Sequence, residues 1–156
     1  MISNGKFYES QFEEATIELL REAHWQYAFG DDIHRKYTDP LIEEDLRNFL
    51  AVQYKDKNLT TSEMDSIVAN LRNTGGQNDY YALRNTFLLY RDGYDFAYSD
   101  GRSNPFRLEY IDFEHPDHNI FRCVNQFVME QGRENRRPDI LLFINGIPVC
   151  IIELKN

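Results

Sequence analysis

Two apolar runs joined by a two-residue turn restrict the fold of this chain more than any other feature of its sequence. Ile140–Ile144 and Ile147–Leu154 are apolar at nearly every position, and Asn145-Gly146 separates them. Strands that are apolar on both faces are typical of the interior of a sheet that is covered on both sides. Asn-Gly is the dipeptide that a tight hairpin prefers. The sequence therefore predicts a central antiparallel hairpin.

Helical patterns dominate residues 1–100, and strand patterns dominate residues 104–156. Four amphipathic stretches have apolar residues at helical spacing, and Thr60 with Glu63 forms the capping box of the third. We expect the four apolar stripes to lie in the core, and the rings that follow the first stretch (Trp25, Tyr27 and Phe29) to fill it. The predicted fold class is α+β (mixed α/β), with N-terminal helices and a mostly antiparallel sheet. The stripes include Phe12, Ala15, Leu19 and Ala23; Leu41, Leu46, Phe49, Leu50 and Val52 after Asp39-Pro40; Met64, Ile67, Val68 and Leu71; and Tyr80, Leu83, Phe87 and Tyr90.

Length and charge exclude several classes of protein. With 156 residues and a formal net charge of −9, the chain fits one domain and does not fit a protein that wraps nucleic acid by bulk charge. No apolar run reaches the ~20 residues of a membrane helix, and no signal peptide is visible at the start. Cys123 and Cys150 lie in apolar runs, where we expect reduced core thiols. These features predict a cytoplasmic protein with no membrane partner.

Three charged residues stand at the ends of the predicted hairpin. Asp139 begins the first strand, and Glu153 and Lys155 end the second. A regular two-residue turn would pair Asp139 with Ile152, so that Asp139 and Glu153 would face opposite sides of the sheet. One bulge, or one extra residue in the turn, would pair Asp139 with Glu153 instead. Because Pro148 has no N–H for the ladder, we predict such an irregularity near Gly146–Pro148.

The converging triplet has two interpretations. Two carboxylates and a nearby carbonyl offer the oxygen ligands that Mg²⁺ prefers, and a lysine can neutralise charge on a phosphate, so the group suits phosphodiester hydrolysis. A structural salt bridge at the end of a sheet explains the same three residues. The spacing alone does not decide between them.

A wider set of residues resembles a known family. Pro138-Asp139 followed by Glu153-Leu154-Lys155 resembles the PD-(D/E)xK nuclease motif. Residues 136–140, 145–148 and 152–156 resemble the N-terminal region of the restriction subunit of type I restriction-modification enzymes. Residues 119–121, 124–127 and the helix at Glu9–Glu13 are similar to that family too.

The resemblance implies a restriction-endonuclease-like core and Mg²⁺-dependent endonucleolytic cleavage of double-stranded DNA. It implies that Asp139 and Glu153 are catalytic metal ligands, that Lys155 is the catalytic lysine, and that the carbonyl of Leu154 is a further ligand. An acidic residue from the first helix would complete the set, Glu13 in first place and Glu9 in reserve, although a solvated helix face explains either residue equally well. The family also implies modification and specificity subunits as partners and an ATP-driven translocation motor.

The chain contains no P-loop sequence, so it shows no ATP site of its own. It stops one residue after Lys155, from which we expect residues 1–156 to be the N-terminal part of a longer endonuclease domain. Two alternatives stay open. One is a non-catalytic module of the same fold that docks to partner subunits, and the other is an unrelated α+β domain with a structural Asp–Lys–Glu cluster. Arg133, Arg136 and Arg137 are either phosphate contacts or a solvated loop.

Overall fold

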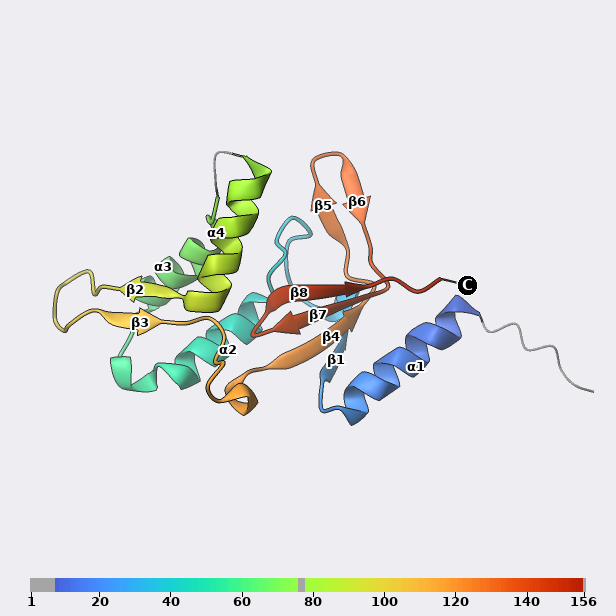
Figure 1. Ribbon diagram of the computed structural model, residues 1–156, viewed down its shortest axis with the longest axis horizontal. Coiled ribbons are helices and arrows are strands. Elements are labelled where there is room, and N and C mark those ends of the chain that lie inside the picture. Colours follow the sequence, from blue (N-terminus) through green and yellow to red (C-terminus); the bar gives the residue numbers. More distant parts are fainter. Residues whose placement is uncertain (1–7, 76–77, 156) are drawn as a thin grey trace, which may run out of the picture. The chain divides into compact units, whose positions relative to one another are not determined.

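The predicted hairpin lies in a four-stranded sheet with the strand order β1-β4-β7-β8 (Figure 1). The computed structural model describes residues 8–75 and 78–155. The strands are β1 (Gln26–Phe29), β4 (Phe121–Asn125), β7 (Ile140–Ile144) and β8 (Ile147–Ile152). β1 runs parallel to β4, whereas the pairs β4–β7 and β7–β8 are antiparallel. The α+β class and the mostly antiparallel sheet are therefore confirmed.

The described residues form two compact units. The first unit contains the sheet, and it consists of the chain up to Ile42 and of the chain from Ile120 onward. Besides the sheet it holds α1 (Glu9–Glu22), a 3₁₀ turn at Gly30–Asp32, and a small hairpin of β5 (Met129–Gln131) and β6 (Glu134–Arg136). The second unit, Glu43–Asn119, is thus an insertion into the first along the sequence.

The second unit is mainly helical. It contains α2 (Glu43–Gln53), α3 (Thr61–Arg72) and α4 (Asp79–Asp92), a two-stranded sheet of β2 (Tyr94–Phe96) and β3 (Phe106–Leu108), and 3₁₀ turns at Lys55–Lys57 and Pro116–His118. The capping box predicted at Thr60 is present, because the Thr60 hydroxyl accepts from the Glu63 N–H and the Glu63 carboxylate accepts from the Thr60 N–H. Among the described residues, no helix has the combination of length and apolar character that crossing a membrane requires.

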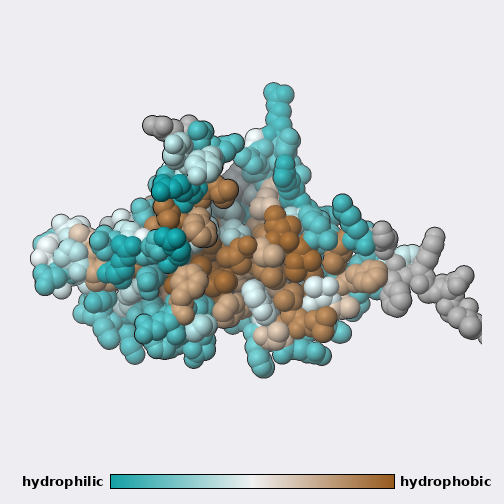
Figure 2. Space-filling model, in the orientation of Figure 1, coloured by the Kyte–Doolittle hydropathy of each residue, from teal (hydrophilic) through white to brown (hydrophobic). Residues whose placement is uncertain are grey.

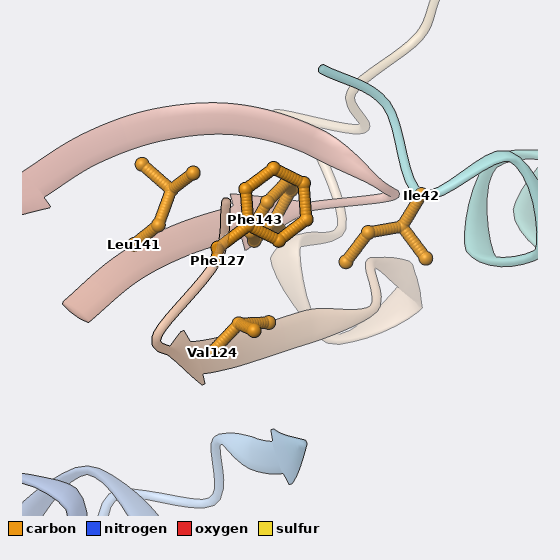
Figure 3. Packing of buried hydrophobic residues seen from close by; sticks show 5 residues of the cluster. All are labelled: Ile42, Val124, Phe127, Leu141 and Phe143. Carbon is orange, nitrogen blue, oxygen red and sulfur yellow. The ribbon is translucent and has the colours of Figure 1, made fainter. Parts of the chain in front are cut away.

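One cluster of the core of the first unit lies on the face of the sheet that carries Leu141 and Phe143. Phe127 and Phe143 are fully buried, with ring centroids 5.0 Å apart, and they pack with Ile42, Val124 and Leu141 (Figure 3). Ala28, Ile33 and Met129 border this cluster. Ile140 and Cys123, which point to the other face, are fully buried as well, so β7 is covered on both faces.

Several residues predicted to be in the core are exposed instead. α1 has no buried residue, and its Phe12 and Leu19 are exposed. Its half-buried positions include Glu13, Thr16 and Ile17, so the helix is rotated relative to the predicted stripe. α4 also has no buried residue. These stripes were predicted from spacing alone, which gives the apolar face of a helix and not the element that covers it. The other exposed apolar side chains on α2 and α4 are Val52, Tyr80, Leu83 and Phe87.

The central position predicted for both hairpin strands is correct for β7 and wrong for β8. β8 is an edge strand of the sheet, and its Val149, Cys150 and Ile151 are exposed. Figure 2 shows apolar side chains gathered over the region where Figure 1 draws this strand. Cys123 is buried as predicted, whereas Cys150 is not, because it lies on this open edge strand.

Candidate functional site

A bulge in the β7–β8 hairpin sets the register of the charged triplet. The turn is regular, since Ile144 pairs with Ile147 across Asn145-Gly146. The next pair is Phe143 with Pro148, but Leu142 then pairs with Cys150, so that Val149 is the extra residue. The predicted irregularity is confirmed and lies one residue beyond the predicted Gly146–Pro148 span. The pairing of Ile144 with Pro148, expected for a three-residue turn, is wrong.

The shifted register brings Asp139 and Glu153 opposite each other. Ile140 pairs with Ile152, so the next positions outward along the two strands are Asp139 and Glu153. A hydrogen bond fixes this end of the hairpin, because the backbone N–H of Leu154 donates to Oδ2 of Asp139 at 2.7 Å. Asp139 is half-buried, while Glu153 and Lys155 are exposed. The Asp139 carboxylate is therefore held in place by the strand that carries the other two.

Glu13 is joined to the same end of the sheet through β4. The Asn125 side chain donates to Oε1 of Glu13 at 2.7 Å, and the Gln126 side chain lies 3.4 Å from both Glu13 oxygens. Asn125 pairs with Ile140, and the backbone N–H of Gln126 donates to the carbonyl of Asp139 at 3.3 Å. Glu13 thus contacts the two residues that flank Asp139 across the sheet. Glu9 is exposed at the first position of α1.

A tyrosine extends this network. The Tyr27 hydroxyl donates to Oδ1 of Asn125 at 2.9 Å. Burial raises the pKa of Tyr27, and the nearby Glu13 acts in the same direction, so the hydroxyl keeps its proton and remains a donor. Because the Asn125 oxygen is engaged by Tyr27, its amide N–H₂ group is oriented toward Glu13. Tyr27, Asn125 and Glu13 also line one open pocket, together with Ser10, Glu14, Ile17, Glu18 and Arg21.

The donor set fits a hard divalent cation in its chemistry. Asp139 and Glu153 offer carboxylate oxygens, and Leu154 offers a carbonyl between Glu153 and Lys155, which are the ligand types of Mg²⁺. Among residues 8–75 and 78–155, the oxygens of Glu13, Asp139 and Glu153 do not all lie within 4.8 Å of one another. Mg²⁺ keeps several of its waters in protein sites and needs only one or two carboxylates as direct ligands.

Sequence reasoning missed the polar residues that hold Glu13. Tyr27, which we expected in the core, lies on β1 and is 40% exposed. Asn125-Gln126 was the available signal, because two amides between the apolar residues Val124 and Phe127 need hydrogen-bond partners. Gln126 adopts a positive φ of 57°, and a Cβ atom on Gly30 would lie 2.3 Å from its carbonyl oxygen. Only glycine at position 30 therefore leaves room for this turn.

The arginines that precede Asp139 are exposed. Arg133, Arg136 and Arg137 lie on or beside the β5–β6 hairpin, and Arg136 makes a 3.6 Å surface ion pair with Glu134. This leaves both interpretations, a phosphate contact and a solvated loop, open.

Comparison with known proteins identifies the family. A family model described as the type I restriction enzyme R protein N terminus matches residues 6–156. The type I restriction enzyme HindI endonuclease subunit of Haemophilus influenzae is 31% identical over 159 residues, which cover 95% of this chain and 15% of the relative. The MjaIXP type I restriction enzyme endonuclease subunit of Methanocaldococcus jannaschii is 28% identical over 152 residues, 92% of this chain and 15% of the relative.

The chain thus spans about 15% of the length of these two relatives. The matched region includes the β7–β8 hairpin, Asp139 and Glu153. The chain belongs to the family formed by the N-terminal region of type I restriction enzyme R proteins.

Proposed function

We propose that this chain supplies the DNA-cleaving centre of a type I restriction subunit. The observation that supports the proposal most directly is the bulge at Val149, with the Leu154–Asp139 hydrogen bond beside it. A salt bridge at a sheet end has no need of a register shift that brings two acids opposite each other. Two carboxylates and one lysine at adjoining strand ends are the groups that hydrolysis of a phosphodiester requires.

In this proposal Asp139, Glu153 and the Leu154 carbonyl hold Mg²⁺. The ion, when bound, stabilises charge on the phosphate and lowers the pKa of a coordinated water. Asp139 is positioned by the backbone of Leu154, so its carboxylate needs little reorganisation. Lys155 places a positive charge next to the scissile phosphate, and Glu13 adds a third acidic group from α1.

The substrate and the partners belong to the same proposal. The substrate is double-stranded DNA, and the partners are modification and specificity subunits, in keeping with the names of the relatives as subunits of type I restriction enzymes. ATP would act on motor domains outside residues 1–156. The proposed location is the cytoplasm, where the free thiols of Cys123 and Cys150 would stay reduced.

The test separates cleavage from movement along DNA. Asp139→Asn, Glu153→Gln and Lys155→Met are each introduced into the complete enzyme, and DNA cutting and ATP-dependent translocation are measured in parallel. We expect each variant to lose cutting and to keep translocation. Glu134→Gln, on the exposed β5–β6 hairpin, is the matched control and should cut normally.

Two results would reject the nuclease assignment. If all three variants still cut, the triplet is structural. If they cut, and charge reversals in the early helices weaken assembly with the other subunits, the chain is the docking module of the alternative interpretation.

A further inference from the structure

A second group of metal-ligating side chains lies on the loop between β3 and β4. Asp112, His115 and His118 each offer one ligand atom, and these three atoms lie within 4.8 Å of one another. His118 Nδ1 is 3.0 Å from Oδ2 of Asp112, and His115 Nδ1 is 3.8 Å from Oδ1. Among the described residues, this is the one group of three or more His, Cys, Asp or Glu side chains that meets this spacing.

The fold of the loop brings the two imidazoles together. His115 precedes the 3₁₀ turn Pro116–His118, and residues three apart are eclipsed in a 3₁₀ helix. The two rings are stacked with centroids 4.9 Å apart. Two hydrogen bonds from Asn119 Nδ2 close the loop, to the carbonyl of Asp112 at 2.8 Å and to that of Pro116 at 3.0 Å. The backbone of this loop therefore places the two histidines side by side.

Asp112 is held rigidly beneath the two rings. Its side chain is 5% exposed, its Oδ1 accepts from the backbone N–H groups of Glu114 and His115, and its Oδ2 accepts from Gln53. Burial alone would raise the pKa of this carboxyl, but the hydrogen bonds from His115, Gln53 and His118 lower it below its ordinary value. The carboxylate is thus ionised, oriented and directed toward two half-exposed imidazoles.

From this geometry we propose that Asp112, His115 and His118 bind a divalent transition-metal ion of the Zn²⁺ type. Zn–N and Zn–O bonds of about 2.0–2.1 Å at tetrahedral angles place neighbouring ligand atoms about 3.3 Å apart, which is within the 4.8 Å that bounds the three ligand atoms here. Two nitrogens and one oxygen suit zinc, cobalt or nickel and do not suit Mg²⁺. The ion would be held through Nδ1 of each ring, and in His118 this atom would exchange its hydrogen bond with Asp112 Oδ2 for the metal.

This site is independent of the proposed nuclease centre. None of Glu13, Asp139, Glu153 and Lys155 contributes to it, and it selects a softer ion than theirs. Three protein ligands would leave one of the four tetrahedral positions to water or to a further ligand. The expected consequence of binding is a more stable loop, because an ion that binds only the folded state stabilises that state.

The test uses Zn²⁺ and Co²⁺ as probes of the purified chain. We expect one ion per chain by calorimetry, a visible Co²⁺ absorption band that Zn²⁺ removes, and a rise in melting temperature. His115→Ala and His118→Ala should each weaken Zn²⁺ binding by about tenfold or more. His34→Ala is the matched control, since His34 is exposed and lies outside the cluster, and it should bind as the wild type does.

A further variant separates metal binding from the structural role of the loop. Asp112→Asn keeps an oxygen that accepts from the backbone N–H groups and removes the charge, so it should fold and lose the ion. The proposal is overturned if the wild type binds no stoichiometric Zn²⁺. It is overturned equally if both histidine variants bind Zn²⁺ as tightly as His34→Ala.

Discussion

At the scale of single residues, Glu13 differs from the neighbouring Glu14 of α1 by its hydrogen bonds to two amide side chains. α1 carries several glutamates, and Glu13 has the amide partners Asn125 and Gln126, whereas Glu14 is exposed. These two amides hold the Glu13 carboxylate beside the end of β4. From the sequence alone, a solvated helix face explained Glu13 and Glu9 as well as a catalytic role did. The reason is that the partners of Glu13 lie more than 100 residues away along the chain.

We predict that Glu13→Gln lowers DNA cutting by the complete enzyme by at least about tenfold. The substitution keeps the size of the side chain and removes the charge that the metal site would use. Cutting is measured under single-turnover conditions. Glu14→Gln is the control, and equal loss in both variants would mean that the overall charge of α1 matters and not the position of Glu13.

A second residue-scale prediction concerns the acid stability of the second unit. Arg102 donates to both oxygens of Glu63, at 2.7 and 2.6 Å, and lowers the pKa of that carboxyl from its ordinary value of 4.5 to about 2. A lowered pKa gives stability that is complete above the ordinary value and is lost as the pH falls toward the lowered one.

Glu63→Gln should therefore lower the urea midpoint of unfolding at pH 6, and the deficit should shrink between about pH 4.5 and about pH 2. Urea titrations at a series of pH values follow this change. Glu44→Gln, at an exposed position of α2, should show no such trend. A deficit that is the same at every pH would show that the Arg102–Glu63 ion pair does not cause the loss of stability in acid.

At the scale of elements, the hairpin and the capped helix were predictable from local signals. Asn145-Gly146 favours a tight turn through its backbone geometry, and Thr60 with Glu63 caps a helix through hydrogen bonds between neighbours in sequence. Both elements are therefore determined by residues that lie close together in the sequence. The covered face of α1 and the edge position of β8 depend on which other segments lie against them. These contacts join segments that are far apart in the sequence, so the spacing of apolar residues within one segment does not predict them.

The bulge at Val149 leads to a prediction about register. Deleting Val149 alone removes the extra residue and leaves Asp139 opposite Glu153, so cutting should persist. Deleting Val149 and Cys150 together should move Asp139 opposite Leu154 and turn Glu153 to the other face, which should abolish cutting. Both variants are tested in the complete enzyme, with circular dichroism of the purified chain as the check on folding. A folded double-deletion variant that cuts would disprove the role of register.

At the scale of the whole molecule, the two junctions of the insertion lie at one turn of the first unit. The Ile42 N–H donates to the carbonyl of Gly146 at 2.9 Å, and the Ile120 N–H donates to the Asn145 side chain at 2.7 Å. The Asn145 N–H returns a bond to the carbonyl of Ile120 at 2.8 Å. The chain therefore leaves the first unit and rejoins it at neighbouring points.

We predict that a short Gly/Ser linker can replace residues 43–119 without unfolding the first unit. Its core cluster consists of residues outside the replaced segment, so the burial that stabilises it is retained. Cooperative thermal unfolding of the shortened chain is the expected result. As a control, Phe143→Ala in the shortened chain should lower its stability by about 3–5 kcal/mol. A shortened chain that melts without cooperativity would contradict the prediction.

The shared junction at Asn145-Gly146 has a consequence for how such proteins can diverge. A segment whose two ends meet at one point can lengthen, shrink or be exchanged without altering the spacing of the strands around it. The Asn145 side chain ties one junction to the tip of the β7–β8 hairpin, whereas Asp139 and Glu153 lie at the opposite, open end of that hairpin. Residues 43–119 can therefore change, for example by gaining the loop with His115 and His118, while Asp139 and Glu153 keep their arrangement at the end of the sheet.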